Sequence, residues 1–151
     1  MTWEQVFNLG YKSYARVMNK FAERMGREKL LNMLEETASE VVAERTKALL
    51  PLVPRRDLAT FALFLKNEPV YRHALVFNIV EESAAVFEIH VSQCLWAKAF
   101  RAQNAGDIGY AAICHADYVG STTYNPKLEL RRTKTLMQGD DYCNHRWVMG
   151  A

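Results

Sequence analysis

The chain has 151 residues, half of them hydrophobic and about a quarter charged, which is typical of one globular domain with a sizeable core. Its 19 Lys and Arg against 17 Asp and Glu leave a net charge of +2, so electrostatics give no reason to expect a nucleic-acid or membrane partner. The apolar runs are too short to cross a bilayer, and the N-terminus lacks the pattern of a signal peptide. Three cysteines fit reduced thiols in the cytoplasm, which is the expected location.

The first 68 residues have the periodicity of helices. Thr2 and Gln5 have the spacing of a capping box, and apolar residues then recur at steps of three, four and seven as far as Gly26. A second helix is predicted over 27–49, and a third over 58–67 with Asp57 as its cap. This part is the helical half of a single domain, 1–151.

The hydrophobic period changes near residue 70, where the α+β half (69–151) begins. Two runs rich in β-branched and aromatic residues predict a hairpin of strands over 70–82 and 84–94. Helices are predicted over 95–104, closed by Gly106, and over 108–123, capped by Asp107. Strands over 127–137 and 141–149 flank the turn sequence QGDD. The predicted fold class is α+β, with N-terminal helices packed on an antiparallel sheet of about four strands and two helices between the hairpins.

Cys94 lies where a predicted strand leads into a helix. A thiol at a helix N-terminus lies near the positive end of the helix dipole, which lowers its pKa and favours the thiolate. The alternative is a small buried hydrophobic residue, the commoner role of a free cysteine.

The helix over 108–123 carries a polar stripe on one face. Its members, at helical spacing, are Tyr110, Cys114, Asp117, Tyr118 and Ser121. A polar stripe is usually solvated surface, but a thiol, a carboxylate and two phenols are also what a pocket wall would contain. Both interpretations stay open at this point.

The last predicted strand places Cys143, His145 and Trp147 on one side. If that side faces inward, a thiol and an imidazole enter the interior together. The plainer interpretations are a core histidine for His145, turn residues for Asp140 and Asp141, and surface charge for Arg132.

Metal binding is a further alternative, because the three cysteines with His115 and His145 supply enough ligands for zinc. No C-x2-C pair is present, however, although Cys143-x-His145 on a strand could serve as the close pair that zinc sites usually have. The sequence has neither a glycine-rich phosphate loop nor a G-x-S-x-G elbow.

Three stretches, CLWAKAF, GDIGYAAICHADY and YNPKLELRRTKTLMQGDDYC, together resemble the L-2-amino-thiazoline-4-carboxylic acid hydrolase family over about residues 70 to 149. In that pattern a cysteine opens a helix, Cys and Asp stand three apart on the next helix, and a Gly-Asp turn precedes a third cysteine. The fitting positions are Cys94, Cys114, Asp117, Pro126, Thr133, Gly139, Asp140 and Cys143. The chain departs from the pattern at Asn144 and His145, where an acidic and an aromatic residue are expected. This departure concerns the identity of the substrate more than membership of the family.

The resemblance implies hydrolytic opening of a small carboxylated cyclic amidine to a carbamoyl-cysteine. We expect no cofactor and no bound metal. The expected catalytic residues are Cys94, Cys114, Asp117, Asp140 and Cys143, and the expected substrate-binding residues are Tyr118, Arg132, Thr133 and His145.

Within this set, Cys94 or Cys143 is expected to be the nucleophile, and Asp117 a general acid/base with a raised pKa. The three sulfurs are expected to line one pocket. The partner is a small-molecule substrate, and a homo-oligomer is possible. The alternatives are a non-catalytic small-molecule-binding module and a zinc-binding protein.

Overall fold

The computed structural model describes all residues 1–151, and its first helices begin and end at the residues expected to cap them. Helix α1 (Trp3–Phe7) carries the capping box between Thr2 and Gln5. It continues through a π-helical turn, η1 (Asn8–Lys12), into α2 (Ser13–Met25), which ends at Gly26 with a φ of 94°. Helix α3 (Arg27–Leu49) follows, then a short 3-10 turn, η2 (Leu50–Leu52), and α4 (Leu58–Asn67), whose N-cap is Asp57.

The prediction of a strand over 70–82 is wrong in its first part, because α5 (Pro69–Ala74) precedes the strand β1 (Leu75–Glu82). Glu68 caps α5 by accepting a hydrogen bond of 2.7 Å from the backbone N–H of Tyr71. Pro69 occupies the first helical position, where its missing N–H costs nothing. A cap and a proline therefore outweigh the β-propensity of the residues that follow.

The middle helices are shorter than predicted. Helix α6 (Leu95–Arg101) ends before Asn104, whose φ of 50° is left-handed, so Gly106 begins the next helix rather than closing this one. The helix expected over 108–123 is interrupted: α7 (Gly106–Gly109) leads into a π-helical turn, η3 (Tyr110–Cys114), and α8 (Asp117–Tyr124) follows. Asp107 lies inside the first turn of α7 rather than at its cap.

Two hairpins form one antiparallel sheet in the order β1-β2-β4-β3. Strand β2 (Val86–Cys94) pairs with β1 and also with β4 (Cys143–Met149), which in turn pairs with β3 (Leu128–Arg131). The strand predicted over 127–137 ends at Arg131, and a 3-10 turn, η4 (Leu136–Gln138), occupies its last residues. The predicted α+β class with four antiparallel strands is confirmed.

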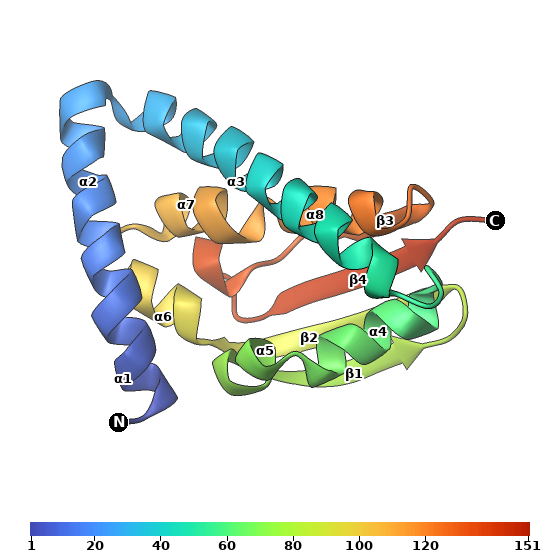
Figure 1. Cartoon of the computed structure of the whole chain (residues 1–151). Helices are drawn as coiled ribbons and strands as arrows, with labels where there is room; N and C mark the ends of the chain where they lie inside the picture. The colour runs from blue at the N-terminus through green and yellow to red at the C-terminus, as the bar shows by residue number, and fades with distance from the viewer.

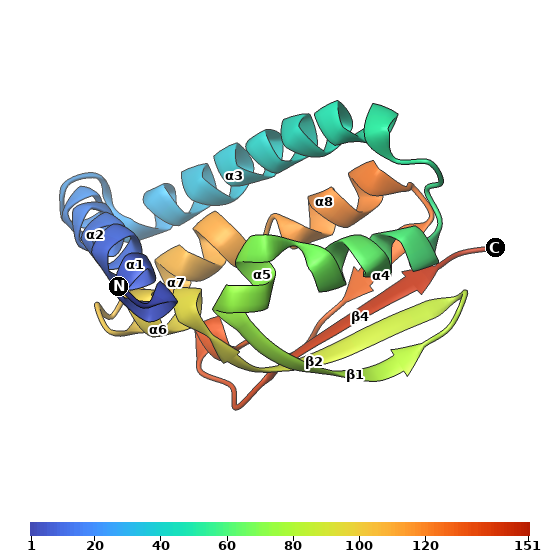
Figure 2. The same cartoon turned by 60° about the horizontal axis from the view of Figure 1, so that its bottom comes forward.

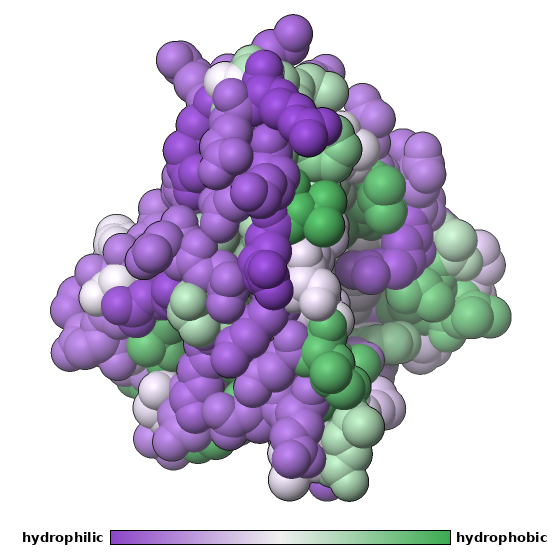
Figure 3. Space-filling model, turned by 90° about the vertical axis from the view of Figure 1, so that its left-hand side faces the viewer, coloured by the Kyte–Doolittle hydropathy of each residue, from purple (hydrophilic) through white to green (hydrophobic).

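The helices lie on one face of the sheet, as Figures 1 and 2 show. Helix α3 crosses above α7 and α8, whereas α4 and α5 lie over β1 and β2 (Figure 2). Helices α1 and α2 stand at one end of the sheet beside α6 (Figure 1), and Figure 3 shows that face. None of the helices is both long enough and apolar enough to pass through a membrane.

The core consists of two clusters of buried side chains. One lies among α1, α2, α6 and α7 and includes Phe7, Trp96, Phe100 and Ile108. The other lies between α4 and the sheet and includes Leu58, Phe87, Leu128 and Trp147. Cys94 packs against both clusters, which places the junction of β2 and α6 at the centre of the molecule.

Candidate functional site

A charged pair joins the start of α8 to the segment that follows β3. Arg132 donates from Nη1 to Oδ2 of Asp117 at 2.8 Å. The Arg132 side chain is only 1% exposed, whereas that of Asp117 is 37% exposed. A buried guanidinium needs a carboxylate to compensate the loss of hydration, and here that carboxylate also faces solvent.

Further contacts hold Arg132 in place. Its Nη2 donates to the carbonyl oxygen of Cys114 at 2.9 Å, and its Cζ lies 5.8 Å and 5.2 Å from the ring centres of Tyr110 and Tyr118. Burial alone would lower the pKa of Arg132, but the nearby charge of Asp117 raises it above its usual value. Arg132 is therefore a permanent cation fixed beneath the carboxylate.

His145 enters the same cluster from β4. Cys143, His145 and Trp147 face the helices, as the alternation of the strand predicts. The His145 ring stacks on Trp147 at 5.4 Å, and its Nε2 lies 3.0 Å from Nη1 of Arg132 and 3.8 Å from Oδ2 of Asp117. Burial lowers the pKa of His145, although Asp117 opposes this effect, so the imidazole is neutral at pH 7.

Two nitrogen atoms of this cluster are buried and have no hydrogen-bond partner, Nε of Arg132 and Nδ1 of His145. An unpaired buried polar group costs about 1–3 kcal/mol, so native proteins retain few of them. Because Nε2 of His145 faces an Arg N–H, the neutral ring carries its proton on Nδ1. Two unused donors therefore lie in a cluster whose carboxylate is open to solvent.

The raised pKa expected for Asp117 is wrong. Burial would raise it, but the charge and the hydrogen bond of Arg132 hold the pKa of Asp117 below its usual value. Asp117 is consequently ionised at neutral pH, and it can accept a proton but does not hold one to donate.

The prediction of a thiolate at Cys94 is also wrong, although the predicted position of Cys94 at the start of a helix is confirmed. Cys94 is the N-cap of α6, and its Sγ accepts a hydrogen bond of 3.4 Å from the backbone N–H of Ala97. Burial outweighs this effect and raises the pKa of Cys94 to about 11. Burial likewise raises the pKa of Cys114 and of Cys143, so the three thiols are protonated at pH 7.

The three thiols lie close enough to influence one another electrostatically. The pKa of Cys114, raised mainly by burial, is raised further by the charge of Asp117 and by the proximity of Cys94 and Cys143, although Arg132 opposes this effect. Cys143 accepts a hydrogen bond of 3.1 Å from the backbone N–H of Leu136. Two strand ends and a π-helical turn therefore bring the thiols into the neighbourhood of Asp117, while a shared pocket stays a prediction.

The remaining predicted residues have structural partners. Asp140 accepts a hydrogen bond of 2.8 Å from the backbone N–H of Thr135, which fixes the turn. Thr133 is exposed, and its N–H and hydroxyl bind the side chain of Asn144. Tyr118 donates to the carbonyl oxygen of Arg132 at 3.4 Å.

The polar stripe is partly buried, and at Ser121 it turns toward the sheet. Ser121 is buried, and its Oγ accepts a hydrogen bond of 3.0 Å from Nε1 of Trp147. Tyr110, Cys114, Asp117 and Tyr118 are half-buried, so the stripe is not a fully solvated surface, and its role as a pocket wall stays a prediction.

Tyr71 is a neighbour of the cluster that the sequence did not reveal. Burial, with a contribution from the charge of Asp117, raises the pKa of Tyr71 to about 12. The prediction of a strand over residues 70–74 concealed it, because side chains point in different directions from a helix and from a strand. In α5 the Tyr71 ring packs edge-on against Trp96, with 6.1 Å between the ring centres. The sequence signal that could have revealed Tyr71 is Glu68 followed by Pro69, a pattern typical of the start of a helix.

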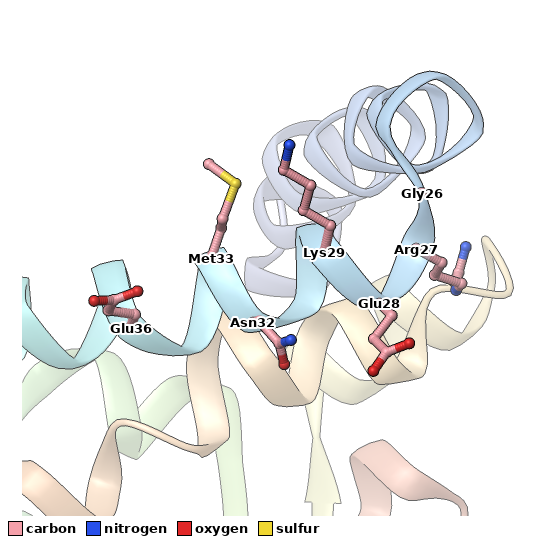
Figure 4. A pocket seen from close by; sticks show the side chains of 7 residues that line it. All are labelled: Gly26, Arg27, Glu28, Lys29, Asn32, Met33 and Glu36. Atoms are coloured by element: carbon pink, nitrogen blue, oxygen red, sulfur yellow. The ribbon is translucent and has the colours of Figure 1, made fainter.

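Two open grooves lie apart from the thiols. One, of about 520 Å³, follows the corner between α2 and α3, and its labelled side chains splay outward in Figure 4 rather than converging. The other, of about 610 Å³, runs between α3 and η4 as far as Tyr110. The second groove ends at the edge of the charged cluster, because the Tyr110 ring lies beside Arg132.

The zinc-binding alternative has no support from the geometry. No three His, Cys, Asp or Glu side chains are placed where they could together hold a metal ion. Cys143 and His145 share a face of β4, but the nitrogen of His145 that faces the cluster points at Arg132.

Comparison with known proteins gives a family and a fold. The model of the L-2-amino-thiazoline-4-carboxylic acid hydrolase family matches residues 7–147. No curated protein matches the sequence. Two solved structures are similar in fold at low sequence identity.

The first is trafficking protein particle complex subunit 3 from Naegleria fowleri, covalently bound to palmitic acid. It has a TM-score of 0.56 and 10% identity, over 95% of this chain and 96% of that chain. The second is the phenol-responsive sensory domain of the transcription activator PoxR with phenol, with a TM-score of 0.60 and 11% identity, over 94% of this chain and 75% of that chain.

Proposed function

Because this chain belongs to the L-2-amino-thiazoline-4-carboxylic acid hydrolase family, we propose that it hydrolyses a small carboxylated cyclic amidine with Asp117 as the base that activates water. The observation that carries the proposal is the solvent-facing carboxylate of Asp117 above two buried, unpartnered nitrogen atoms of Arg132 and His145. Such donors point to a ligand that completes their hydrogen bonding.

The geometry suits the removal of a proton from water. Arg132 keeps Asp117 ionised, and a carboxylate is a base only in that form. Arg132 lies beneath it, so the cation also stabilises negative charge that develops in the transition state. A carboxylate with a lowered pKa is a weak base, so most of the rate enhancement must come from the positioning of water beside the substrate.

The proposed reaction breaks the C–N bond of the ring. Water adds to the sp2 carbon between nitrogen and sulfur, and Asp117 takes the proton that the water loses. Asp117 passes this proton to the ring nitrogen. The hydroxyl group of the tetrahedral intermediate then gives its proton, through Asp117, to the same nitrogen, which leaves as an amine as the C–N bond breaks and the carbonyl forms. One water is consumed, and the product is an S-carbamoyl-cysteine with a free amine.

In this proposal Arg132 Nε donates a hydrogen bond to the bound substrate, and the neutral His145 holds the Arg132 side chain by accepting from it at Nε2. The thiols of Cys94, Cys114 and Cys143, being protonated, form the wall of the site. Catalytic roles for these cysteines and for Asp140 stay predictions, as do substrate contacts of Tyr118 and Thr133.

The test is incubation with L-2-amino-thiazoline-4-carboxylate, with mass spectrometry of the products. The proposal expects a product heavier by one water that carries a free amine and no free thiol. A free thiol would mean that the C–S bond breaks instead, and an unchanged substrate would reject hydrolysis of this compound.

A non-catalytic binding module is the second candidate. It is favoured by the three protonated thiols and by the two structures of similar fold, which are described as bound to palmitic acid and to phenol. Calorimetric titration separates the candidates, because a binding module would give saturable heat with the thiazoline and no turnover.

A further inference from the structure

The groove between α3 and η4 has room for more than one small ring. Its volume is about 610 Å³, and its lining comes from α3, the end of α6, α7, η3 and η4. Arg101 lies at its outer end. Tyr110, whose ring centre is 5.8 Å from Cζ of Arg132, lies at its inner end. The groove therefore leads from solvent to the charged cluster that contains Asp117.

Two glycines of α7 give the groove its shape. A Cβ on Gly106 would lie 2.5 Å from the carbonyl oxygen of Met137, and a Cβ on Gly109 would lie 2.5 Å from its Sδ. Both distances are too short for real atoms, so only glycine lets η4 pack directly on α7. This packing buries Met137 and holds Gln138 and Gly139 at the rim of the groove. The groove is thus built into the backbone of the fold.

The charged cluster has no unpaired positive charge for the carboxylate of a substrate. Arg132 already binds Asp117 at 2.8 Å, and the imidazole of His145 is neutral. Glu35 on α3 adds a carboxylate to the groove, and its contact at 4.0 Å is with Nδ1 of His115, directly after η3. A carboxylate on the reacting ring would meet like charge there, whereas a neutral amide in its place would not.

The outer end of the groove offers a free cation. Arg101 is exposed and forms no ion pair, and its hydrogen bond from Nη1 to the carbonyl oxygen of Leu136 is long at 3.4 Å. The carboxylate of Asp107 also lines the groove, but Arg27 neutralises it through hydrogen bonds of 2.6 Å and 2.7 Å. A guanidinium that is free in this way can bind a carboxylate through two parallel hydrogen bonds.

From this distribution of charge we propose that the substrate is a short peptide whose N-terminal cyclic amidine enters the charged cluster and whose C-terminal carboxylate binds Arg101. The inference rests on the proposed hydrolysis and narrows its substrate class. The carboxyl group of the ring is an amide in this substrate, so it carries no charge into the cluster. The ring opens in the same way, with one water consumed and the peptide bonds intact. The product begins with an S-carbamoyl-cysteine residue that has a free amine.

The separation of the two ends of the groove sets the length of the peptide. A Cβ on Gly106 would lie 3.4 Å from Cγ of Arg101, which places Arg101 beside the start of α7. From Gly106 to Tyr110 is four residues, or about 6 Å along a helix. With the 5.8 Å between Tyr110 and Arg132, the whole span is on the order of 12 Å. An extended residue covers about 3.4 Å, so the ring followed by roughly two residues bridges it.

Polar groups on the two walls of the groove suit the backbone of such a peptide. On η4, Oε1 of Gln138 accepts a hydrogen bond of 2.8 Å from the hydroxyl of Thr135, so the amide N–H groups of Gln138 are free to donate to a peptide carbonyl. On α3, the carboxylate of Glu35 can accept from a peptide N–H. The apolar side chains of Leu31 and Met137 lie along the same groove.

The experiment compares three substrates. They are free 2-amino-thiazoline-4-carboxylate, the same ring joined through an amide to Gly-Gly with a free carboxylate, and that peptide with a C-terminal amide. The wild type should hydrolyse the peptide with the free carboxylate at a kcat/KM at least tenfold above that of the other two. Arg101→Gln should hydrolyse the two peptides equally, and its rate with the free ring should stay that of the wild type.

Two further variants make the test specific to the charge at Arg101. Arg101→Lys keeps a positive charge and should retain most of the preference for the free carboxylate. Arg16→Gln is the matched control, because Arg16 on α2 is also exposed and forms no ion pair but lies outside the groove. It should behave like the wild type with all three substrates. Circular dichroism checks that each variant is folded.

The inference and the proposed hydrolysis can fail separately. Hydrolysis of the free ring without a preference for the peptide, or a preference that Arg101→Gln leaves unchanged, would overturn the inference and leave the hydrolysis standing. If no thiazoline is hydrolysed, the hydrolysis fails, and calorimetric titration with the two peptides tests the groove alone. The wild type should then bind the free carboxylate at least tenfold more tightly than the amide, and Arg101→Gln should remove this difference. Equal affinities in the wild type would overturn the inference.

Discussion

Arg132 and Asp117 share a hydrogen bond of 2.8 Å but are unequally exposed, with 1% of the arginine side chain and 37% of the aspartate side chain open to solvent. The cation is thus a fixed internal part of the protein, and the anion is the group that a small molecule can reach. This inequality separates the pair from an ordinary surface salt bridge, in which both groups are hydrated.

Asp117→Asn should destabilise the fold, because it leaves the buried guanidinium of Arg132 without a counter-charge. Removing one partner of a fully buried pair costs about 3–5 kcal/mol, and solvent at the exposed carboxylate reduces the expected cost to about 2 kcal/mol. Urea denaturation measures this difference. Glu129→Gln is the control, because the pair between Glu129 and Arg131 is exposed on both sides and its loss should change little. Equal stabilities of the two variants would contradict this account of the pair.

His145 should make stability depend on pH. Burial lowers the pKa of His145 in the folded protein below the ordinary value of 6.5, so the unfolded chain binds more protons as the pH falls through 6.5. The folded state should therefore lose stability between about pH 7 and the lower folded pKa. His145→Gln removes this contribution, and its unfolding free energy should change less over that interval. If the unfolding free energies of the wild type and of His145→Gln change with pH in parallel, His145 is not held neutral in the folded protein.

The thiols should react slowly with alkylating agents in the folded protein. A pKa of about 11 at Cys94, against an ordinary value of 9.0, leaves about 100-fold less thiolate at neutral pH than an ordinary thiol has. Iodoacetamide labelling followed by peptide mass spectrometry should show slow modification of Cys94, Cys114 and Cys143. The same protein in urea should be labelled rapidly at all three positions. Rapid labelling of one cysteine in the folded state would restore it as a candidate nucleophile.

Asp140 allows a turn role and a catalytic role to be separated. Asp140→Asn keeps an oxygen that can accept from the N–H of Thr135, so the fold should retain nearly all of its stability. Asp140→Ala loses that acceptor and should cost about 1 kcal/mol. If the residue only shapes the turn, the Asn variant keeps the wild-type hydrolytic rate. A stable but inactive Asp140→Asn protein would instead assign Asp140 to catalysis.

Local signals in the sequence predicted much of the fold. Thr2, Gly26 and Asp57 mark helix ends through hydrogen bonds with their own neighbours, and such contacts can be read from spacing alone. The alternation of β4 likewise predicted the inward side of Cys143 and His145.

Features that depend on tertiary packing were not predictable in this way. The π-helical turns have no simple sequence pattern, and the ionisation of Asp117 depends on Arg132, which is distant in the sequence and follows a different strand. The protonated state of Cys94 follows from burial between two core clusters, and a helix N-terminus alone suggests the opposite. The position of a charge in the sequence does not reveal how much solvent surrounds it in the fold.

The rate of hydrolysis of L-2-amino-thiazoline-4-carboxylate by the wild type and by Asp117→Asn tests the central claim most directly. The wild type should open the ring, and the variant, shown to be folded by circular dichroism, should lose on the order of 10³-fold in kcat/KM, because the base is absent. Equal rates for the two proteins, or no turnover by the wild type, would contradict the role of Asp117 in this hydrolysis.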